Sequence, residues 1–378
     1  MIRSLWNAAM ITLALVTSVC AQTMKHVQNS DAQRSSVIVQ DTTLLHSSQV
    51  TSTDEKQLWA TTQTLLTRGQ SSFDEVAKLN LYATQAKRLS QLERFIRQQY
   101  PEQECPAICS VVTPLPDGKT IALDFVAVSR REVSQVEKIV ANRNQVSMMP
   151  RGKRIYISGQ AAREVNLKEA AAQTLQGLLL TMEFLKRNKR DVASIKAFLM
   201  PMEKAEFVMQ AVTQVFGEGN EPPVVFVQWQ SSEIVPVEIE MVIWGGKANE
   251  TKPVVEYLTP PGMTSSPVFS RICRINSGPT IFLSGISSTD SDIEVQIQQT
   301  FNLLTKTLHE ADSDIRHLVK ATYYVIDGRA SSVLGSLRPK IYTPLRPPAA
   351  SKATVPVIGE RNPGFLMDMI AVPVKNGR

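Results

Sequence analysis

The chain contains few of the residues that hold metal ions or build disulfide frameworks. Its 378 residues include four cysteines and four histidines. His26, His46, His309 and His317 have no ligand spacing with one another or with the cysteines. Zinc sites need such residues at short, regular intervals. The sequence therefore argues against a zinc site, and it predicts no metal or other cofactor.

Long hydrophobic runs are missing too, except at the N-terminus, so we expect no transmembrane segment. Hydrophobic residues make up 43% of the chain and charged residues 20%, which is typical of a soluble globular protein. The formal net charge of +6 is small for this length and predicts no nucleic-acid partner. A chain of this size suits two or three domains.

The N-terminal exception resembles a secretory signal. Arg3 supplies a short basic region, the apolar stretch 8–19 is too short to span a bilayer comfortably, and small residues precede Gln22. These features predict a signal peptide at 1–21 and export to the periplasm or the medium. A lipid anchor on Cys20 is the alternative, but Val19 directly before the cysteine fits that signal poorly.

Three cysteines remain after such processing: Cys105, Cys109 and Cys273. In an oxidising compartment Cys105 and Cys109 could form a local disulfide. The alternative is that Cys109 is an ordinary buried strand residue. The sequence leaves both interpretations open.

The strongest pattern in the sequence is an internal repeat. An apolar strand ending in Ser-Gly at 154–159 returns at 279–285, with the second serine 126 residues after the first. A helix follows each strand, and its apolar residues recur at helical spacing in both copies. A middle strand, a second helix, a Pro-Pro pair and a final strand come next. The Pro-Pro pairs are Pro222-Pro223 and Pro347-Pro348, which stop the chain before it enters another strand.

A fainter first copy keeps the same order of elements, with the strand 43–48 before its first helix and Ser48 in the glycine position. The order strand, helix, strand, helix, two strands predicts an α+β module with two helices on one face of a mixed sheet. The predicted spans of the three modules are 36–130, 138–246 and 254–375.

The third copy resembles the Rid (YjgF) family of small imine and enamine deaminases. The resemblance covers 254 to about 374 and is carried by the sequences at 257–262, 269–271, 283–285 and 370–372. It implies a chorismate-mutase-like fold. Family members are homotrimers with a small-molecule cleft at each subunit interface. Three fused copies would therefore make an intramolecular pseudo-trimer that is a monomer in solution.

The same resemblance implies a substrate-clamping arginine and a water-ordering glutamate, and no copy carries the whole set. The arginine position corresponds to Ile108, Val225 and Lys352 in the three copies. The glutamate position corresponds to Ala122, Glu238 and Leu366, and Phe269 replaces an aromatic hydroxyl. A composite cleft would need Lys352 from one copy beside Ser158, Gly159 and Glu238 from another.

These positions define a set of candidate site residues. The candidate catalytic acid is Glu238, and the candidate ligand-binding residues are Lys352, Ser284, Gly285, Ser158, Gly159, Phe269 and Thr354. Each has a plain alternative. Lys352 would be a solvated surface lysine, and the Ser-Gly pairs would serve only a turn. The acids that recur in all three copies favour a structural role in the assembly over chemistry: Asp124, Glu240 and Asp368.

We therefore interpret the chain as an exported Rid-like protein that binds a small ligand or acts as a scaffold, without the full deaminase site. The alternative is deaminase-like hydrolysis of small imines or enamines at one residual cleft between modules. The expected ligand is a 2-imino or 2-oxo acid. Endoribonuclease activity is not favoured, because no basic surface interleaved with aromatic residues is present.

Overall fold

The computed structural model describes residues 23–28, 35–141, 143–230, 235–343 and 346–374. The predicted signal peptide at 1–21 and Cys20 lie outside these residues. No helix in the described part of the chain is long and apolar enough to span a membrane.

The described chain forms three mixed sheets, each with two helices. The first sheet and its helices comprise β3 (Leu44–Ser47), β4 (Val50–Ser52), α1 (Glu55–Arg68), β5 (Val76–Ala83), α2 (Ala86–Arg97), β6 (Ala107–Val112) and β7 (Ile121–Val128). The second comprise β10 (Arg154–Gln160), α3 (Leu167–Phe184), β11 (Val192–Leu199), α4 (Ala205–Phe216), β12 (Val224–Gln228) and β13 (Val237–Trp244). The third comprise β16 (Thr280–Leu283), α5 (Ile293–Glu310), β17 (Leu318–Val325), α6 (Gly328–Ile341), β18 (Ala349–Thr354) and β19 (Phe365–Ala371).

Three hairpins complete these sheets: β1 (Met24–Gln28) with β2 (Ser35–Val39), β8 (Glu137–Ala141) with β9 (Asn144–Met149), and β14 (Val255–Leu258) with β15 (Ile272–Ile275). The strand orders are then β6-β5-β7-β3-β9-β8, β12-β11-β13-β10-β15-β14 and β18-β17-β19-β16-β2-β1. The three sheets therefore share one topology, and the predicted α+β fold of three modules is confirmed.

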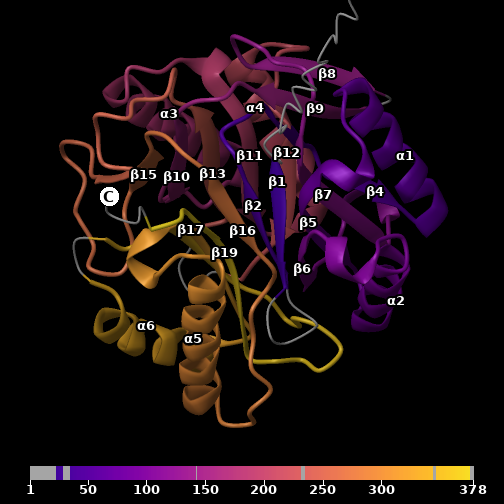
Figure 1. The fold of residues 1–378 in the computed structure, drawn as a ribbon, viewed down its shortest axis with the longest axis vertical. Helices are drawn as coiled ribbons and strands as arrows, with labels where there is room; N and C mark the ends of the chain where they lie inside the picture. Colours follow the sequence, from indigo (N-terminus) through magenta and orange to yellow (C-terminus); the bar gives the residue numbers. More distant parts are fainter. Residues whose placement is uncertain (1–22, 29–34, 142, 231–234, 344–345, 375–378) are drawn as a thin grey trace, which may run out of the picture.

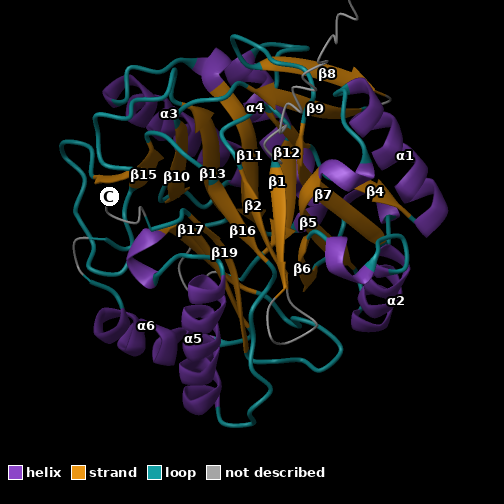
Figure 2. Cartoon of the chain, in the orientation of Figure 1, coloured by secondary structure: helices purple, strands orange, loops and turns teal. Residues whose placement is uncertain are grey.

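The main helix of each module forms where the repeat predicts it. Asp54, Asn166 and Asp292 cap α1, α3 and α5, each accepting a hydrogen bond from a backbone amide of the first turn. The predicted apolar stripe of α5 is fully buried against the third sheet, and its members are Ile297, Phe301, Leu304 and Leu308. The helices cover the outer faces of the sheets, and the strands fill the centre of the molecule (Figures 1 and 2).

The inner faces of the three sheets pack on one another. One buried cluster joins Tyr82 and Cys109 of the first sheet to Phe198 of the second and to Tyr324 and Leu366 of the third. Two further clusters also draw residues from more than one sheet. The three modules therefore form an intramolecular pseudo-trimer around a common axis.

Each hairpin completes a sheet other than the one that the chain enters next. β9 pairs with β3 of the first sheet although the chain then runs into β10 of the second. In the same way β15 pairs with β10, and the N-terminal β2 pairs with β16 of the third sheet. The N-terminal hairpin therefore closes the ring of three sheets. The spans predicted for the modules stay predictions as domain boundaries, and sheet hydrogen bonding crosses them.

The three crossovers from hairpin to sheet meet around the guanidinium of Arg154. This fully buried side chain forms an ion pair with Asp41 of the first crossover at 2.9 Å. It also donates to Gly278 O of the third crossover at 3.1 Å and to Thr280 Oγ1, at the start of β16, at 3.2 Å. Asp41 accepts a further bond from the backbone amide of Gly152 at 2.8 Å. Arg154 thus holds all three crossovers together, and its removal would leave Asp41 without its ion-pair partner.

The candidate disulfide between Cys105 and Cys109 is not formed in this structure. Cys105 and Cys109 are both free and buried. Cys105 lies in the helix-side core of the first module, whereas Cys109 lies on the opposite face of β6 in the cluster between sheets. The alternative prediction, that Cys109 is a buried strand residue, matches the structure.

Candidate ligand-binding site

Three serines occupy matching positions at the ends of β3, β10 and β16. Each donates its backbone amide to the hairpin that completes its sheet, and the pairs are Ser48 with Gln145 O (2.8 Å), Ser158 with Arg271 O (2.9 Å) and Ser284 with Ser35 O (3.0 Å). The residues that follow these serines are Gln49, Gly159 and Gly285. The sequence placed Ser48 in the glycine position, and the structure corrects this by one residue to Gln49.

The edge strand of a neighbouring sheet runs past each of these three residues. The edge strands are β12, β18 and β6, and they define three matching boundaries between sheets. At the boundary of the first and second sheets, Gln49 donates its backbone amide to Val224 O at 3.1 Å. Its side-chain amide donates to Phe226 O at 3.0 Å and accepts from Phe226 N at 3.4 Å. The Gln49 side chain therefore closes this boundary.

The boundary of the third and first sheets is closed in another way. Gly285 donates its backbone amide to Ile108 O at 2.8 Å, and Ser284 Oγ accepts from Ile108 N at 3.1 Å. A Cβ on Gly285 would lie 3.1 Å from Leu366 Cδ1 and 3.2 Å from Cys109 Sγ, so apolar side chains fill the remaining space. Ser284 and Gly285 therefore bind the neighbouring strand, and their role in binding a ligand stays a prediction.

The boundary of the second and third sheets differs from both. Among the described residues, Gly159 makes no backbone bond to β18, and the buried atoms Ser158 Oγ and Glu238 Oε1 have no hydrogen-bond partner. A Cβ on Gly159 would lie 2.0 Å from Glu238 Oε1. Only glycine therefore leaves room for the carboxylate, which packs directly on the backbone of Gly159. The structure brings these three predicted residues together.

The carboxyl group of Glu238 is electrostatically unusual. Burial raises its pKa to about 7. The nearby Ser351 hydroxyl of the third sheet opposes this shift, although it donates its proton to Glu240 Oε2 at 2.5 Å. The neighbouring carboxylate of Glu240 also raises this pKa, whereas the positive charges of Lys320 and Lys352 lower it. Glu238 is therefore close to half-protonated at neutral pH and is able both to donate and to accept a proton.

Lys352 takes a different place from the predicted carboxylate clamp. Its Nζ lies 2.6 Å from Ser331 Oγ on α6, and its neighbour in the parallel pairing is Tyr323, a member of the helix-side core. Burial, reinforced by the charge of Arg338, lowers the pKa of Lys352. Lys352 thus acts on Glu238 through space and makes no direct contact with it among the described residues.

The pairing of the edge strands shows why the predicted arginine positions do not match. Val225 of β12 lies opposite Lys196, and the residue in the matching place on β18 is Ser351, opposite Thr322. Lys352 is one residue further along. Because alternate strand residues face opposite sides of a sheet, this one-residue difference turns Lys352 towards the helices and Ser351 towards the neighbouring sheets.

The two remaining candidates lie on either side of this boundary. Phe269 is half-buried in the loop between β14 and β15, with the Arg271 guanidinium 4.9 Å above its ring. This loop touches the site through the bond from Ser158 N to Arg271 O. Thr354 lies at the end of β18, where its carbonyl accepts from Gln230 N at 2.7 Å. Phe269 therefore contacts a residue that binds Ser158, whereas Thr354 contributes to the contact between strand ends.

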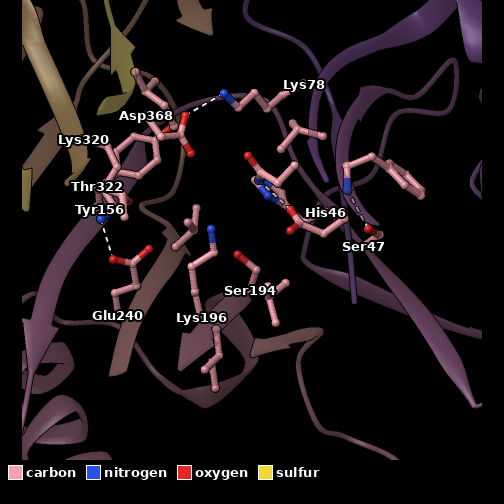
Figure 3. Close-up of a pocket in the computed structure, with 18 of the residues that line it drawn as sticks. His46, Ser47, Lys78, Tyr156, Ser194, Lys196, Glu240, Lys320, Thr322 and Asp368 are labelled. Carbon is pink, nitrogen blue, oxygen red and sulfur yellow. Dashed lines mark hydrogen bonds and ion pairs between the residues drawn. The ribbon is translucent and has the colours of Figure 1, made fainter. Parts of the chain in front are cut away.

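Two buried ion pairs link the sheets and were not predicted from the sequence. Lys78 of the first sheet pairs with Asp368 of the third at 2.6 Å, and Lys320 of the third pairs with Glu240 of the second at 2.5 Å (Figure 3). The structural role predicted for these acids agrees with such contacts. The lysines carried no separate signal, because a lysine in a strand is most often solvated.

No family model and no curated protein sequence matches the chain. Among solved structures, it is similar to a YjgF family member from Neisseria meningitidis, with 18% identity, a TM-score of 0.25, and coverage of 32% of this chain and 96% of that one. It is also similar to a Rid family protein from Yersinia pestis, with 20% identity, a TM-score of 0.24, and coverage of 25% and 79%. A YjgF family structure from Mycobacterium tuberculosis gives 17% identity, a TM-score of 0.23, and coverage of 25% and 78%.

Each of these similarities extends over about one module of this chain and most of the other protein. They concern the fold and carry no information about ligands. The family named by these structures is the one that the third repeat resembles. The comparisons thus show a similarity of parts of this chain to solved Rid (YjgF) family structures, and the chain itself holds three modules in one polypeptide.

Proposed function

We propose that the chain binds a small molecule at the boundary of the second and third sheets, against Glu238, Ser158 and the edge strand β18. The observation that carries the proposal is the pair of buried polar atoms without partners, Ser158 Oγ and Glu238 Oε1. Leaving buried polar atoms unpaired costs about 1–3 kcal/mol each. Polar atoms on a ligand would remove this cost, whereas the matching boundaries satisfy their own polar groups.

The ligand that suits this chemistry is a small 2-oxo or 2-imino acid. Protonated Glu238 and the Ser158 hydroxyl would both donate hydrogen bonds to a carbonyl oxygen, which has two lone pairs, whereas an imine nitrogen would accept from one of them. The positive charge of Lys352 acts on the same place and would favour its carboxylate. The absence of an arginine fork leaves a point charge only, so we expect weaker and less directional binding than a bidentate clamp provides.

Calorimetry with 2-oxobutanoate tests this site. Binding should weaken as the pH rises through about 7, because ionised Glu238 loses the proton that it donates. Glu238→Gln should bind with no such pH dependence, since an amide still donates. Ser158→Ala should weaken binding about tenfold, and the exposed control Glu203→Gln should change nothing. Binding that ignores pH in the parent and is unaffected by Ser158→Ala would contradict the proposal.

A second function is favoured by one observation, the pKa of Glu238 at about 7, which suits a general acid and base near neutral pH. The chain would then hydrolyse small imines or enamines at the same site. Imines generated in situ from amino acids provide the assay. Acceleration over spontaneous hydrolysis that Glu238→Gln abolishes would support an enzyme, and no acceleration would leave a binding protein.

Export and a monomeric state also belong to the proposal. N-terminal sequencing of the natural protein should begin at Gln22, whereas a lipid-modified Cys20 would support the anchor instead. Small-angle scattering should give the mass of one chain, because the three sheets already enclose their common axis. A measured homotrimer would contradict the monomeric state.

A further inference from the structure

The three sheets place matching residues around their common axis. Lys78 on β5, Ser194 on β11 and Lys320 on β17 are equivalent, because each lies two residues before the position opposite the repeated acid. Lys78 reaches Asp368 of the third sheet, and Lys320 reaches Glu240 of the second. The same rotation would carry a lysine at position 194 to Asp124 of the first sheet.

The third ion pair is missing, since position 194 holds a serine. Asp124 accepts hydrogen bonds from Asn80 at 2.8 Å and from Tyr82 at 2.7 Å, which are neutral donors. Burial raises the pKa of Asp124, although the positive charge of Lys196 opposes this. Asp124 thus lacks the lysine partner that the equivalent carboxylates, Glu240 and Asp368, have.

Lys196 brings a positive charge to this place without forming an ion pair. Within the described part of the chain its Nζ has no hydrogen bond and no carboxylate within salt-bridge distance. Burial disfavours its ammonium form, but Tyr324 and then Asp124 outweigh that effect and raise its pKa. Figure 3 shows the side chain extending into the space between the two ion pairs and His46.

A cavity of about 90 Å³ lies at this point, lined by residues of all three sheets. Lys196, Asp124, Ser194 and His46 are among its polar residues, and His46 Nε2 is buried without a partner. Burial, with the charge of Arg154, lowers the pKa of His46 to about 4, so its ring is neutral at physiological pH. Since a cavity needs about 10–15 Å³ by this measure to hold one water molecule, the space suits a molecule of several non-hydrogen atoms.

We propose that this cavity is a binding site for a small zwitterion of the α-amino-acid type, with its carboxylate on Lys196 and its ammonium group on Asp124. The charges select this ligand. Lys78 and Lys320 are already neutralised, so one cation and one anion remain. A single anion would satisfy Lys196 but add negative charge beside Asp124, and a single cation would do the reverse. A zwitterion pairs both groups and leaves the net charge of the cavity unchanged.

This site is separate from the one against Glu238, because its ligand would contact neither Ser158 nor Gly159. The crucial variant is Ser194→Lys, which restores the missing ion pair to Asp124 and fills the cavity. It should fold, should lose glycine binding, and should keep 2-oxobutanoate binding at the other boundary. The two proposals can therefore fail independently of each other.

The experiment follows ¹³C-labelled glycine by NMR titration of the full chain, with acetate and methylammonium as probes carrying one charge each. Glycine should bind more tightly than either. Lys196→Met and Asp124→Asn should each weaken glycine binding about tenfold or more, whereas the exposed control Lys168→Met should not. Absence of glycine binding in the parent would overturn the proposal, and so would acetate binding as tight as glycine or glycine binding that survives Ser194→Lys.

Discussion

The boundary of the first and second sheets and the boundary of the second and third differ by two residues. At the first, Gln49 follows the serine and Ala122 lies on the final strand, so the glutamine side chain has room to bond Phe226. At the boundary of the second and third sheets, Gly159 follows the serine, and Glu238 takes the place of Ala122 on the final strand. The space between the sheets is thus filled by the side chain of Gln49, after β3, at one boundary and by that of Glu238, on β13, at the other. Glutamine satisfies its neighbours, whereas the carboxylate leaves polar atoms unpaired.

The three boundaries have the same fold but differ in whether their buried polar groups are hydrogen-bonded. Two boundaries have become ordinary packing, in which backbone and side-chain groups satisfy one another. The boundary of the second and third sheets has Glu238, a group with a shifted pKa, and such shifts are typical of functional positions.

The largest effect should come from the buried ion pairs that hold two of the boundaries. Lys320→Met leaves Glu240 buried without its ammonium partner, and Lys78→Met does the same to Asp368. Each should lower the free energy of unfolding by about 3–5 kcal/mol, measured by urea denaturation. Ser194→Met at the matching position breaks no ion pair and is the control. A cost equal to that of the lysine variants would show that volume, rather than charge, governs these positions.

A smaller effect should come from filling the glycine position. Gly159→Ala puts a Cβ 2.0 Å from Glu238 Oε1, whereas the Cβ of Gly285→Ala lies 3.1 Å or more from its neighbours. Gly159→Ala should cost about 1–3 kcal/mol in unfolding free energy and should displace Glu238. Gly285→Ala should cost less. Equal costs at the two positions would contradict the close packing of the carboxylate on Gly159.

The titration of Glu238 gives a pH dependence of comparable size. Its folded pKa of about 7 exceeds the ordinary value of 4.5, so the folded chain binds more protons between these values. Stability due to this group therefore falls as the pH rises from 4.5 to about 7, and it stays lower above. Glu238→Gln should remove this loss and raise the unfolding free energy above pH 7 by about 3 kcal/mol. A pH profile identical to that of the parent would show that Glu238 is solvated.

The smallest effect should come from opening the closed boundary. Gln49→Ala removes two side-chain hydrogen bonds to Phe226 and should cost about 1–2 kcal/mol. Because Ala122 supplies no acid there, this variant should gain no pH-dependent binding of 2-oxobutanoate. Gln49→Gly together with Ala122→Glu copies the second boundary and should gain it. Failure of that double variant would mean that the site depends on more than these two residues.

Much of the module could be predicted from the sequence, because it depends on local patterns. The stripe of Ile297, Phe301, Leu304 and Leu308 predicts the helix that they bury, and the alignment of Glu238 with Ala122 and Leu366 holds in the strand pairing. The alignment of β12 with β18 predicted from the sequence was wrong by one residue. It matched Lys352 to Val225, whereas Ser351 occupies that place. Nothing local fixes that register, since it depends on how a parallel strand meets its neighbour after a long connection.

The sequence by itself determined three copies of one α+β module and the Glu238 and Gly159 pair, because amphipathic spacing and residue type act over a few positions. Only the tertiary structure decided which hairpin completes which sheet, which boundaries are closed, and that Lys196 and Asp124 face one cavity. These features depend on contacts between residues far apart in the chain, such as Arg154 with Asp41 and Lys78 with Asp368. Their energies depend on burial and on the nearest charges, which only packing defines.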